Sequence, residues 1–206
     1  MKPPLLSYIT CSYIGMTAYG IPKILEADDD FDMHIVDCDS KDDTWKLVSR
    51  MCDRRIKSST RFDENKGPAY ALNYNLSKRE AKQFFIKVDN DAVIHNRDWI
   101  CRFLKVFDTF TEAGLLMAVY NNPESFELTG LVPKYRAGTC YLKLDADTAD
   151  CFSAGCWFFR PEIFNYEDFW CPESCFNGNE ICRRARLYTP YTIGLMTDIK
   201  IGRNSR

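Results

Sequence analysis

Histidine is scarce in this sequence, since only His34 and His95 occur among 206 residues. A metal-dependent hydrolase typically draws on several histidine and carboxylate ligands, so this scarcity argues against that class of enzyme. Neither sign of charge dominates, because 27 lysines and arginines face 29 aspartates and glutamates. The net charge of −2 argues against a dedicated nucleic-acid binder, which would carry a basic surface. No stretch approaches the roughly 20 apolar residues of a membrane-spanning helix.

Cysteine is more frequent, but its ten copies fall below the density of a small disulfide-stapled protein. The opening Met-Lys-Pro-Pro lacks the pattern of a signal peptide, so we expect reduced thiols and a cytoplasmic protein. Cys171 and Cys175 are spaced like one arm of a zinc site, and Cys151 with Cys156 forms a loose second pair. Because no histidine is near, the pattern favours buried apolar cysteines over zinc.

Apolar runs alternate with helical stripes over residues 1–120, with short connections between them. This alternation predicts an α/β fold with a mostly parallel, Rossmann-like sheet flanked by helices. We expect one domain over 1–206, in which 1–120 binds a ligand and 121–206 forms a smaller mixed region. Strands are expected at 5–13, 33–36, 56–62, 84–88, 115–120, 139–144 and 156–159. Helices are expected at 19–27 (with Pro22 in the first turn), 45–52, 68–76, 98–110 and 179–187, and residues 200–206 are expected to fray.

Polar segments follow three of the expected strands, and ligands of such sheets bind at the carboxyl ends of strands. These segments are Cys11-Ser12-Tyr13, Asp37-Cys38-Asp39 and Asp89-Asn90-Asp91. The last offers two carboxylates, the oxygen ligands that Mg²⁺ or Mn²⁺ takes together with substrate phosphates. A strand that simply ends in solvated acids would look the same. Asp145-Ala146-Asp147 repeats the pattern after a later apolar strand, so local inspection leaves both pairs open.

The order of several short motifs adds a more specific signal. They are Ser7–Tyr13, the segment 35–44 that reads IVDCDSKDDT, Asn65-Lys66-Gly67 with Ala71 and Asn73, Val88–Asp91, and Asp98-Trp99-Ile100. In this order they resemble family-2 glycosyltransferases of the GT-A fold, over about the first 110 residues. Only Asp89 and Asp91 follow the Asn-x-Gly helix at the spacing of that family, so the resemblance selects them over the later acidic pair.

The resemblance implies an inverting glycosyltransferase that moves one sugar from a nucleoside-diphosphate sugar, with UDP favoured, to an acceptor hydroxyl. It also implies Mn²⁺ or Mg²⁺ as cofactor, held by Asp91 and Asp89, with Asp198 as the nearest available late ligand. The segment 153–161 resembles the strand before the acceptor site, and there Trp157 is the candidate for stacking on a sugar. The implied donor contacts are Cys11, Ser12, Tyr13, Asp37, Cys38, Asp39, Lys66, Gly67, Asn73, Asp89, Asn90 and Asp91.

Gly178-Asn179-Glu180 falls where the family has Gly-Glu-Asp, which makes Glu180 the implied catalytic base and puts Asn179 on the acceptor side. Without the resemblance, Glu180 would be a first-turn glutamate stabilised by the helix dipole and by Arg183 and Arg184. The family's Gln-x-x-Arg-Trp motif of processive members is absent, which favours addition of a single sugar.

The sequence also departs from the family. Cys38 replaces the aspartate that contacts uracil, so either Asp37 or Asp39 substitutes or the base is not uracil. The late histidine near the metal is missing, and His95 is the histidine that could face the site. A sugar-phosphate nucleotidyltransferase is one alternative, but residues 11–20 lack the basic residues of its glycine-rich loop. A non-catalytic nucleotide- or carbohydrate-binding module is the other, and the acceptor stays open among glycan, protein, lipid-linked sugar and modified nucleobase.

Overall fold

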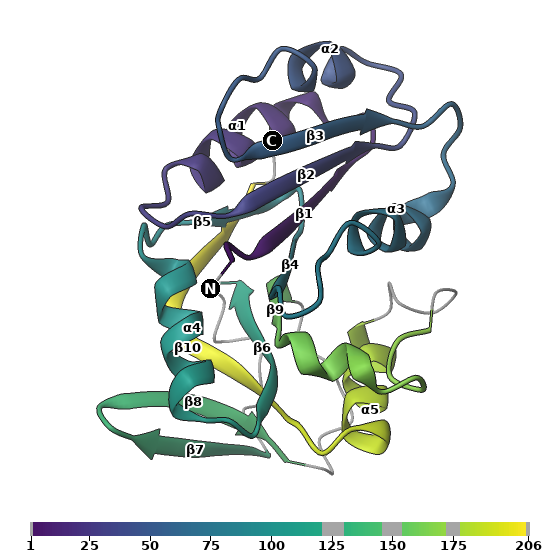
Figure 1. The fold of residues 1–206 in the computed structure, drawn as a ribbon. Coiled ribbons are helices and arrows are strands. Elements are labelled where there is room, and N and C mark those ends of the chain that lie inside the picture. Colours follow the sequence, from purple (N-terminus) through teal and green to yellow (C-terminus); the bar gives the residue numbers. More distant parts are fainter. Residues whose placement is uncertain (1, 121–129, 146–153, 172–177, 205–206) are drawn as a thin grey trace.

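The computed structural model describes residues 2–120, 130–145, 154–171 and 178–204. One mixed sheet runs through the molecule, with helices on both of its faces (Figure 1). The helical elements are α1 (Ile14–Leu25), α2 (Thr44–Val48), α3 (Gly67–Leu76), α4 (Trp99–Thr109), the 3-10 helix η2 (Pro161–Asn165) and α5 (Gly178–Tyr188). The strands are β1 (Leu5–Thr10), β2 (Asp32–Asp37), β3 (Ile56–Arg61), β4 (Phe85–Val88), β5 (Ala92–Ile94), β6 (Ala113–Tyr120), β7 (Leu131–Arg136), β8 (Thr139–Leu144), β9 (Ala154–Phe159) and β10 (Thr192–Arg203).

The first four strands form the parallel unit that the sequence predicts. β1 pairs with β2 in the register Leu5↔Asp32 to Thr10↔Asp37, and it pairs with β4 on its other side up to Tyr8↔Val88. In parallel strands the carboxyl ends lie at the same edge of the sheet. The loops after β1, β2 and β4 therefore come together there.

The sheet as a whole is mixed, so the prediction of a mostly parallel sheet holds for β1 to β4 but not for the sheet as a whole. The strand order is β3-β2-β1-β4-β9-β6-β10-β8-β7, and β5 pairs with β10. Among the described strands, four pairings are parallel and five are antiparallel. β9 enters antiparallel between β4 and β6, and β7 and β8 form a hairpin through Ala137 and Gly138. A two-residue connection can join only antiparallel strands.

Several elements differ from the sequence prediction. α1 begins at Ile14, so Pro22 lies inside the helix instead of in its first turn. The sequence does not predict β5, β7 and β10. β10 extends to Arg203 and its end pairs with β5, so residues 200–203 do not fray.

Gly194 and Gly202 interrupt the apolar pattern of β10, but each lets a side chain from another element pack closely against the strand. A Cβ at Gly194 would meet the Tyr141 ring at 2.2 Å, and one at Gly202 would meet His95 at 2.9 Å.

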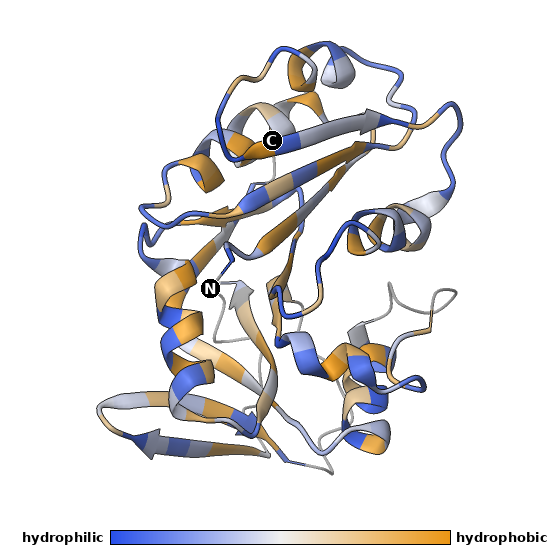
Figure 2. Ribbon diagram, in the orientation of Figure 1, coloured by the Kyte–Doolittle hydropathy of each residue, from blue (hydrophilic) through white to orange (hydrophobic). Residues whose placement is uncertain are grey.

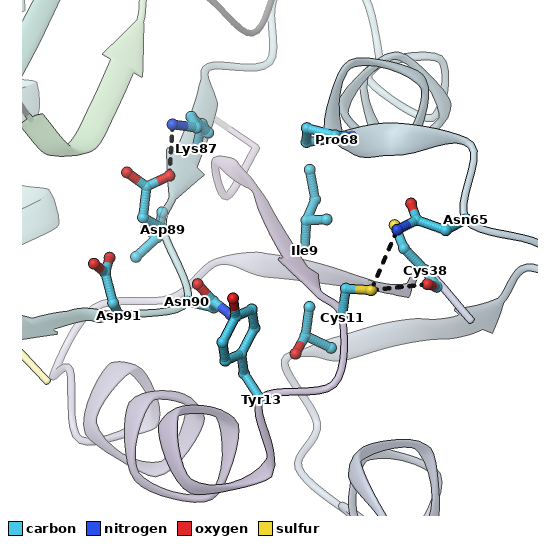
Figure 3. A pocket seen from close by; sticks show the side chains of 12 residues that line it. Ile9, Cys11, Tyr13, Cys38, Asn65, Pro68, Lys87, Asp89, Asn90 and Asp91 are labelled. Carbon is cyan, nitrogen blue, oxygen red and sulfur yellow. Dashed lines mark hydrogen bonds and ion pairs between the residues drawn. The ribbon is translucent and has the colours of Figure 1, made fainter. Parts of the chain in front are cut away.

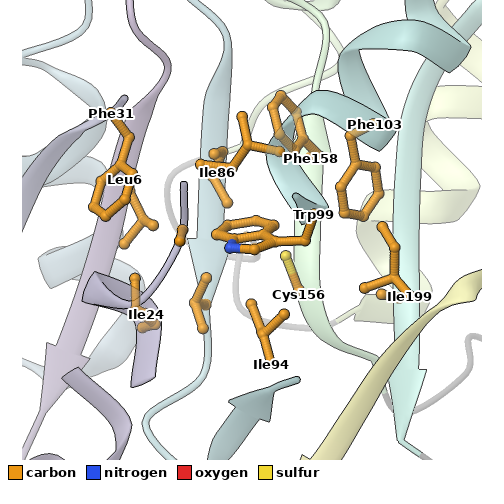
Figure 4. Close-up of a cluster of buried hydrophobic side chains, with 14 of the residues drawn as sticks. Leu6, Ile24, Phe31, Ile86, Ile94, Trp99, Phe103, Cys156, Phe158 and Ile199 are labelled. Atoms are coloured by element: carbon orange, nitrogen blue, oxygen red, sulfur yellow. The ribbon is translucent and has the colours of Figure 1, made fainter. Parts of the chain in front are cut away.

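Two hydrophobic clusters lie on opposite faces of the sheet, because successive strand residues point to opposite sides. Leu6 and Tyr8 of β1 belong to the cluster under α1 and α4, whereas Leu5 belongs to the cluster under α3 and α5. Trp99 of α4 lies at the centre of the first cluster (Figure 4), and the apolar faces of the helices turn toward the sheet (Figure 2). None of the described helices is both long and apolar enough to cross a bilayer.

The cysteines of this interior support the expectation of buried apolar residues. Cys156 lies in the first cluster and Cys182 in the second. Within the described ranges, no three histidine, cysteine or acidic side chains gather as metal ligands. Cys151 and Cys175 of the two cysteine pairs lie outside the described residues.

Candidate active site

A cavity of about 350 Å³ opens at the carboxyl ends of β1, β2 and β4 (Figure 3). Asp89 and Asp91 lie on one side of it, and Asn65 and Cys38 lie on the opposite side. The cavity brings together six of the residues predicted to contact a ligand, namely Cys11, Tyr13, Cys38, Asp89, Asn90 and Asp91. Its other lining residues are Ile9, Thr10, Asn65, Pro68, Lys87 and Val88.

The acidic pair occupies a tight turn between β4 and β5. The amide of Asp89 donates to the carbonyl of Gly155 at 2.9 Å, and the amide of Ala92 donates to the carbonyl of Asp89 at 3.0 Å. The hydroxyl of Tyr8 donates to the carbonyl of Asn90 at 3.3 Å. These three hydrogen bonds to main-chain carbonyls hold the turn, so both carboxylates are fixed at the wall of the cavity.

Each carboxylate of the pair has a cationic partner. Lys87 Nζ lies 2.5 Å from Asp89 Oδ1, and Arg203 Nε lies 3.1 Å from Asp91 Oδ2. The hydroxyl of Tyr120 donates to Asp91 Oδ1 at 2.5 Å. Burial, reinforced by the charges of Asp89 and Asp91, raises the pKa of Tyr120 far above its usual range, so this hydroxyl stays protonated and acts as a donor.

The donor set fits a hard divalent cation. The side chains of Asp89 and Asp91 keep 30% and 24% of their surface exposed, and both line the same cavity. Mg²⁺ commonly takes one or two carboxylates and completes its shell with substrate phosphates and water, and Mn²⁺ also suits carboxylate and water ligands. Among the described side chains, no third histidine, cysteine or acidic group joins the pair, so phosphate oxygens and water would complete the shell.

Asp198 does not belong to this donor set, which corrects the predicted late ligand. Its carboxylate lies 3.2 Å from Nη1 of Arg102, and both residues line a different cavity beside α4. His95 does not line the cavity of the acidic pair; it lines a neighbouring cavity together with Tyr19 and Arg203. The residue that reaches the acidic pair from the end of the chain is Arg203.

Thiols and an aromatic ring form the opposite end of the cavity. The Cys11 thiol donates to the carbonyl of Cys38 at 3.1 Å, and the Asn65 amide approaches Cys11 Sγ at 3.5 Å. Burial raises the pKa of Cys38 to about 12 and also raises that of Cys11, so both thiols are neutral. Tyr13 also lines the cavity, between this end and Asn90, and stays 54% exposed (Figure 3). This end can therefore accept a planar, uncharged ring.

Asp37 and Asp39 do not line the cavity, so neither takes the place of the uracil-contacting aspartate there, and of the two alternatives a base other than uracil remains. Asp37 is fully buried; its carboxylate accepts hydrogen bonds from the amide and the hydroxyl of Ser40, and Arg61 Nε lies 3.6 Å away. Asp39 is paired with Lys41 at 2.5 Å and with Arg61 at 3.7 Å. Both carboxylates organise the loop after β2 and are not offered to a ligand.

Asn65 and Pro68 line the cavity, but the predicted contacts Lys66, Gly67 and Asn73 do not. Gly67 has a φ of +81°, which favours glycine, and its amide donates to Asn65 Oδ1 at 2.9 Å. Lys66 lies over the ring of Tyr70 at 5.0 Å. Asn73 accepts a hydrogen bond of 2.6 Å from the indole of Trp170. Lys66, Gly67 and Asn73 thus position Asn65 and α3, and the structure does not bring their side chains to the cavity wall.

Trp157 is a core residue, which corrects its predicted role on the acceptor side. Only 4% of it is exposed, and its indole N–H donates to the carbonyl of Ala154 at 2.9 Å. Lys87 Nζ lies 5.5 Å from the centre of its ring. Trp157 therefore supports the lysine that holds Asp89.

Glu180 and Asn179 lie in the first turn of α5, outside the lining of the cavity. Glu180 accepts two hydrogen bonds of 2.9 Å from Arg183, and Arg184 lies 3.7 Å away. The hydrogen bonds from Arg183 lower the pKa of Glu180, so its carboxylate is ionised at neutral pH. Of the rival acidic pair, Asp145 follows β8 and Asp147 lies outside the described residues.

Sequence reasoning did not identify Lys87, Tyr120 and Arg203 as members of the site. Lys87 had a local signal, since it is a lone charge in an apolar strand two residues before Asp89. Tyr120 had no local sequence signal; its contact with the site appears only in the structure, where a Cβ at Gly155 would come within 2.8 Å of the tyrosine ring. Arg203 carried no signal beyond the basic composition of the chain end.

The sequence model of glycosyl transferase family 2 matches residues 20–166. No curated protein sequence matches the chain. Similar solved structures include residues 1–349 of S. aureus TarS, at 16% identity and a TM-score of 0.70 over 97% of this chain and 60% of that one. The mannosyltransferase PcManGT from Pyrobaculum calidifontis, solved with GDP-Man and Mn²⁺, is 16% identical, with a TM-score of 0.76 over 100% of this chain and 58% of that one.

Residues 1–349 of TarS have also been solved with UDP-GlcNAc, at 15% identity and a TM-score of 0.69 over 97% of this chain and 58% of that one. At such identities the likeness concerns the fold. The chain spans about three fifths of the length of these similar proteins.

Proposed function

Because the chain belongs to glycosyl transferase family 2, we propose that its strand-end cavity binds a nucleoside-diphosphate sugar and that it transfers one sugar, with inversion, to an acceptor hydroxyl. The presence of Asp89 and Asp91 on one wall of this cavity carries the proposal. The similar proteins of known structure, solved with UDP-GlcNAc or with GDP-Man and Mn²⁺, support the substrate class.

The two ends of the cavity suit the two parts of such a donor. The nucleobase would lie at the end formed by Tyr13, Cys38 and Asn65, where an exposed aromatic ring and neutral thiols are present. The diphosphate would lie toward Asp89 and Asp91. Because no carboxylate faces the base end, the lining residues do not select uracil, and uridine and guanosine, the nucleosides of the TarS and PcManGT complexes, are therefore both tested.

Asp91 and Asp89 are the residues that would hold a Mn²⁺ or Mg²⁺ ion. When bound, the ion would offset the charge that develops on the leaving diphosphate. The chain contributes by orienting the two carboxylates: Tyr120 holds Asp91 Oδ1, and Lys87 holds Asp89 Oδ1. The bond from the Asp89 amide to the Gly155 carbonyl and the bond from the Tyr8 hydroxyl to the Asn90 carbonyl keep the turn rigid, so the geometry is set before the donor arrives.

Glu180 is the proposed base, which accepts the proton of the acceptor hydroxyl as that oxygen attacks the sugar. Its ionised state supports this role, because only the carboxylate form can take a proton. Its pairing with Arg183 and Arg184 also weakens it as a base. Binding of an acceptor near α5 would therefore need to loosen the ion pair with Arg183.

The test is the release of nucleoside diphosphate from UDP-GlcNAc, UDP-glucose and GDP-mannose, measured with and without Mn²⁺, together with calorimetric binding of UDP and GDP. We expect Asp91→Asn to lower the release rate by about 100-fold. Asp145→Asn, in the rival acidic pair, is the matched control and should leave the rate unchanged. Failure of every nucleotide to bind the wild-type protein would overturn the proposed substrate class, and equal rates in the two variants would overturn the role of Asp91.

A further inference from the structure

The end of β10 is bound to Asp91 through both its main chain and its side chain. The amide of Asn204 donates to the carbonyl of Asp91 at 2.7 Å, and Arg203 Nε lies 3.1 Å from Asp91 Oδ2. Arg203 pairs across the strands with Ala92, the residue after Asp91. The position of this arginine is therefore set by the sheet and does not depend on a flexible tail.

Tyr120 joins the same arrangement from β6. The Tyr120 hydroxyl donates a hydrogen bond to Asp91 Oδ1. The Arg203 guanidinium lies over the Tyr120 ring, with its central carbon 4.4 Å from the ring centre. Arg203 therefore has two attachments: an ion pair with Oδ2 and a cation–π contact with the tyrosine. A group that displaced the ion pair would leave the cation–π contact in place.

Among the described residues, the charges of the acidic pair and of its two cationic partners cancel. Asp89 and Asp91 carry two negative charges, and Lys87 and Arg203 carry two positive ones at 2.5 and 3.1 Å. A divalent cation alone would add positive charge to a neutral group, and a diphosphate alone would add negative charge. Arrival of both together keeps the balance, so electrostatics favours joint binding.

We propose that Arg203 is an internal counter-ion of Asp91, which leaves Oδ2 when a divalent cation and a nucleoside diphosphate bind together, and then holds a phosphate oxygen of that nucleotide. This inference rests on the proposed function, since it takes the diphosphate as the ligand of the cavity. A guanidinium suits the second role because its planar donors match phosphate oxygens. The side chain of Arg203 is 56% exposed, which leaves it accessible to a nucleotide.

The proposal predicts reciprocal coupling between metal and nucleotide. In the wild-type protein Mn²⁺ alone should bind weakly, because it competes with Arg203, and saturating UDP should tighten Mn²⁺ binding by tenfold or more. In Arg203→Met, which keeps an apolar stem over Tyr120, Mn²⁺ alone should bind about fivefold tighter, while UDP in the presence of Mn²⁺ should bind more weakly. The coupling between the two ligands should shrink accordingly.

The measurement is the dissociation constant of Mn²⁺ from the paramagnetic resonance of free Mn²⁺, with and without UDP, and that of UDP by calorimetry. Arg203→Lys should restore the weak binding of Mn²⁺ alone, which a purely structural role of the arginine stem would not do. Arg102→Met, which removes the ion pair with Asp198 in another cavity, is the matched control.

Mn²⁺ binding measured without nucleotide tests whether Arg203 competes with the cation for Asp91. Unchanged or weaker Mn²⁺ binding in Arg203→Met would overturn it, because the arginine would then not compete for Asp91. Tighter Mn²⁺ binding together with undiminished binding of UDP in the presence of Mn²⁺ would overturn the transfer of Arg203 to the phosphate. Absence of UDP and GDP binding in the wild-type protein would instead count against the proposed function.

Discussion

The amide of Ser12 donates a hydrogen bond of 2.8 Å to the hydroxyl of Ser40, and this bond joins the ends of β1 and β2. The Ser40 hydroxyl in turn donates to the buried carboxylate of Asp37. The amide of Lys41 donates back to the Ser12 hydroxyl at 2.9 Å. Two loops that are far apart in the sequence are thus locked together beside the base end of the cavity.

Ser40→Ala should destabilise the protein by about 1–3 kcal/mol, because it leaves one oxygen of the buried Asp37 carboxylate without this donor. We expect a lower urea midpoint and weaker UDP binding. Ser49→Ala is the control, since its hydroxyl makes an exposed bond of 3.3 Å to the Lys46 carbonyl, and it should change neither quantity. Equal midpoints for the two variants would contradict the role of the Ser40 bond.

Gly155→Ala should disturb the acidic pair from the opposite strand. The new Cβ would lie 2.8 Å from the Tyr120 ring and 2.9 Å from the Ala92 Cβ, closer than packed atoms tolerate. We expect a loss of about 1–3 kcal/mol in unfolding free energy and weaker Mn²⁺ binding in the presence of UDP.

The matching test is a double-mutant cycle with Tyr120→Leu, which removes part of the clash. The second substitution should recover part of the stability lost in Gly155→Ala, but not the Mn²⁺ binding, since the hydroxyl that holds Asp91 is gone. Strictly additive stability losses would show that the two residues do not interact.

Protonation of His34 should weaken the fold at mildly acidic pH. Burial lowers the pKa of His34 from 6.5 to about 4. Between these two values His34 is protonated in the unfolded chain but neutral in the folded one. This contribution to stability is present above pH 6.5 and is lost as the pH falls toward 4. The urea midpoint, measured across this range, should fall less in His34→Asn than in the wild type. His95→Asn, at an exposed position, should follow the wild-type profile; identical profiles for all three would disprove the assignment.

Glu180→Gln should bind UDP like the wild type and transfer sugar about 100-fold more slowly, because the amide cannot accept a proton. Arg183→Ala removes the group that lowers the pKa of Glu180. The acidic limb of its transfer rate should therefore shift to higher pH. Full transfer activity in Glu180→Gln would assign the base to another residue.

The parallel unit could be predicted from the sequence because β1, β2 and β4 are contiguous apolar runs with polar ends. β10 could not, because Gly194 and Gly202 resemble breaks until the side chains of Tyr141 and His95 are seen to fill the space above them. The extent of antiparallel pairing in the sheet escaped prediction for a related reason. Strand order depends on pairing between distant segments, and periodicity within one segment carries no information about it.

The candidate site divides in the same way. Asp89 and Asp91 are neighbours in the sequence, so their shared position follows from the strand they end. The segment Asp37-Cys38-Asp39 marked the correct loop, but only the packing shows that Cys38 lines the cavity while Asp37 is buried. Arg203 reaches Asp91 through the pairing of β10 with β5, and no local sequence pattern indicates this pairing.

The place of β9 in the sheet has a consequence for the order of folding during synthesis. β9 lies between β4 and β6 although both precede it in the chain. Until residues 154–159 have left the ribosome, each of those strands has an open edge, and the amide of Asp89 lacks its partner at Gly155. Pairing between such distant segments is slow, and open edges invite wrong partners. The acidic turn is therefore completed late, when the nascent chain inserts its ninth strand.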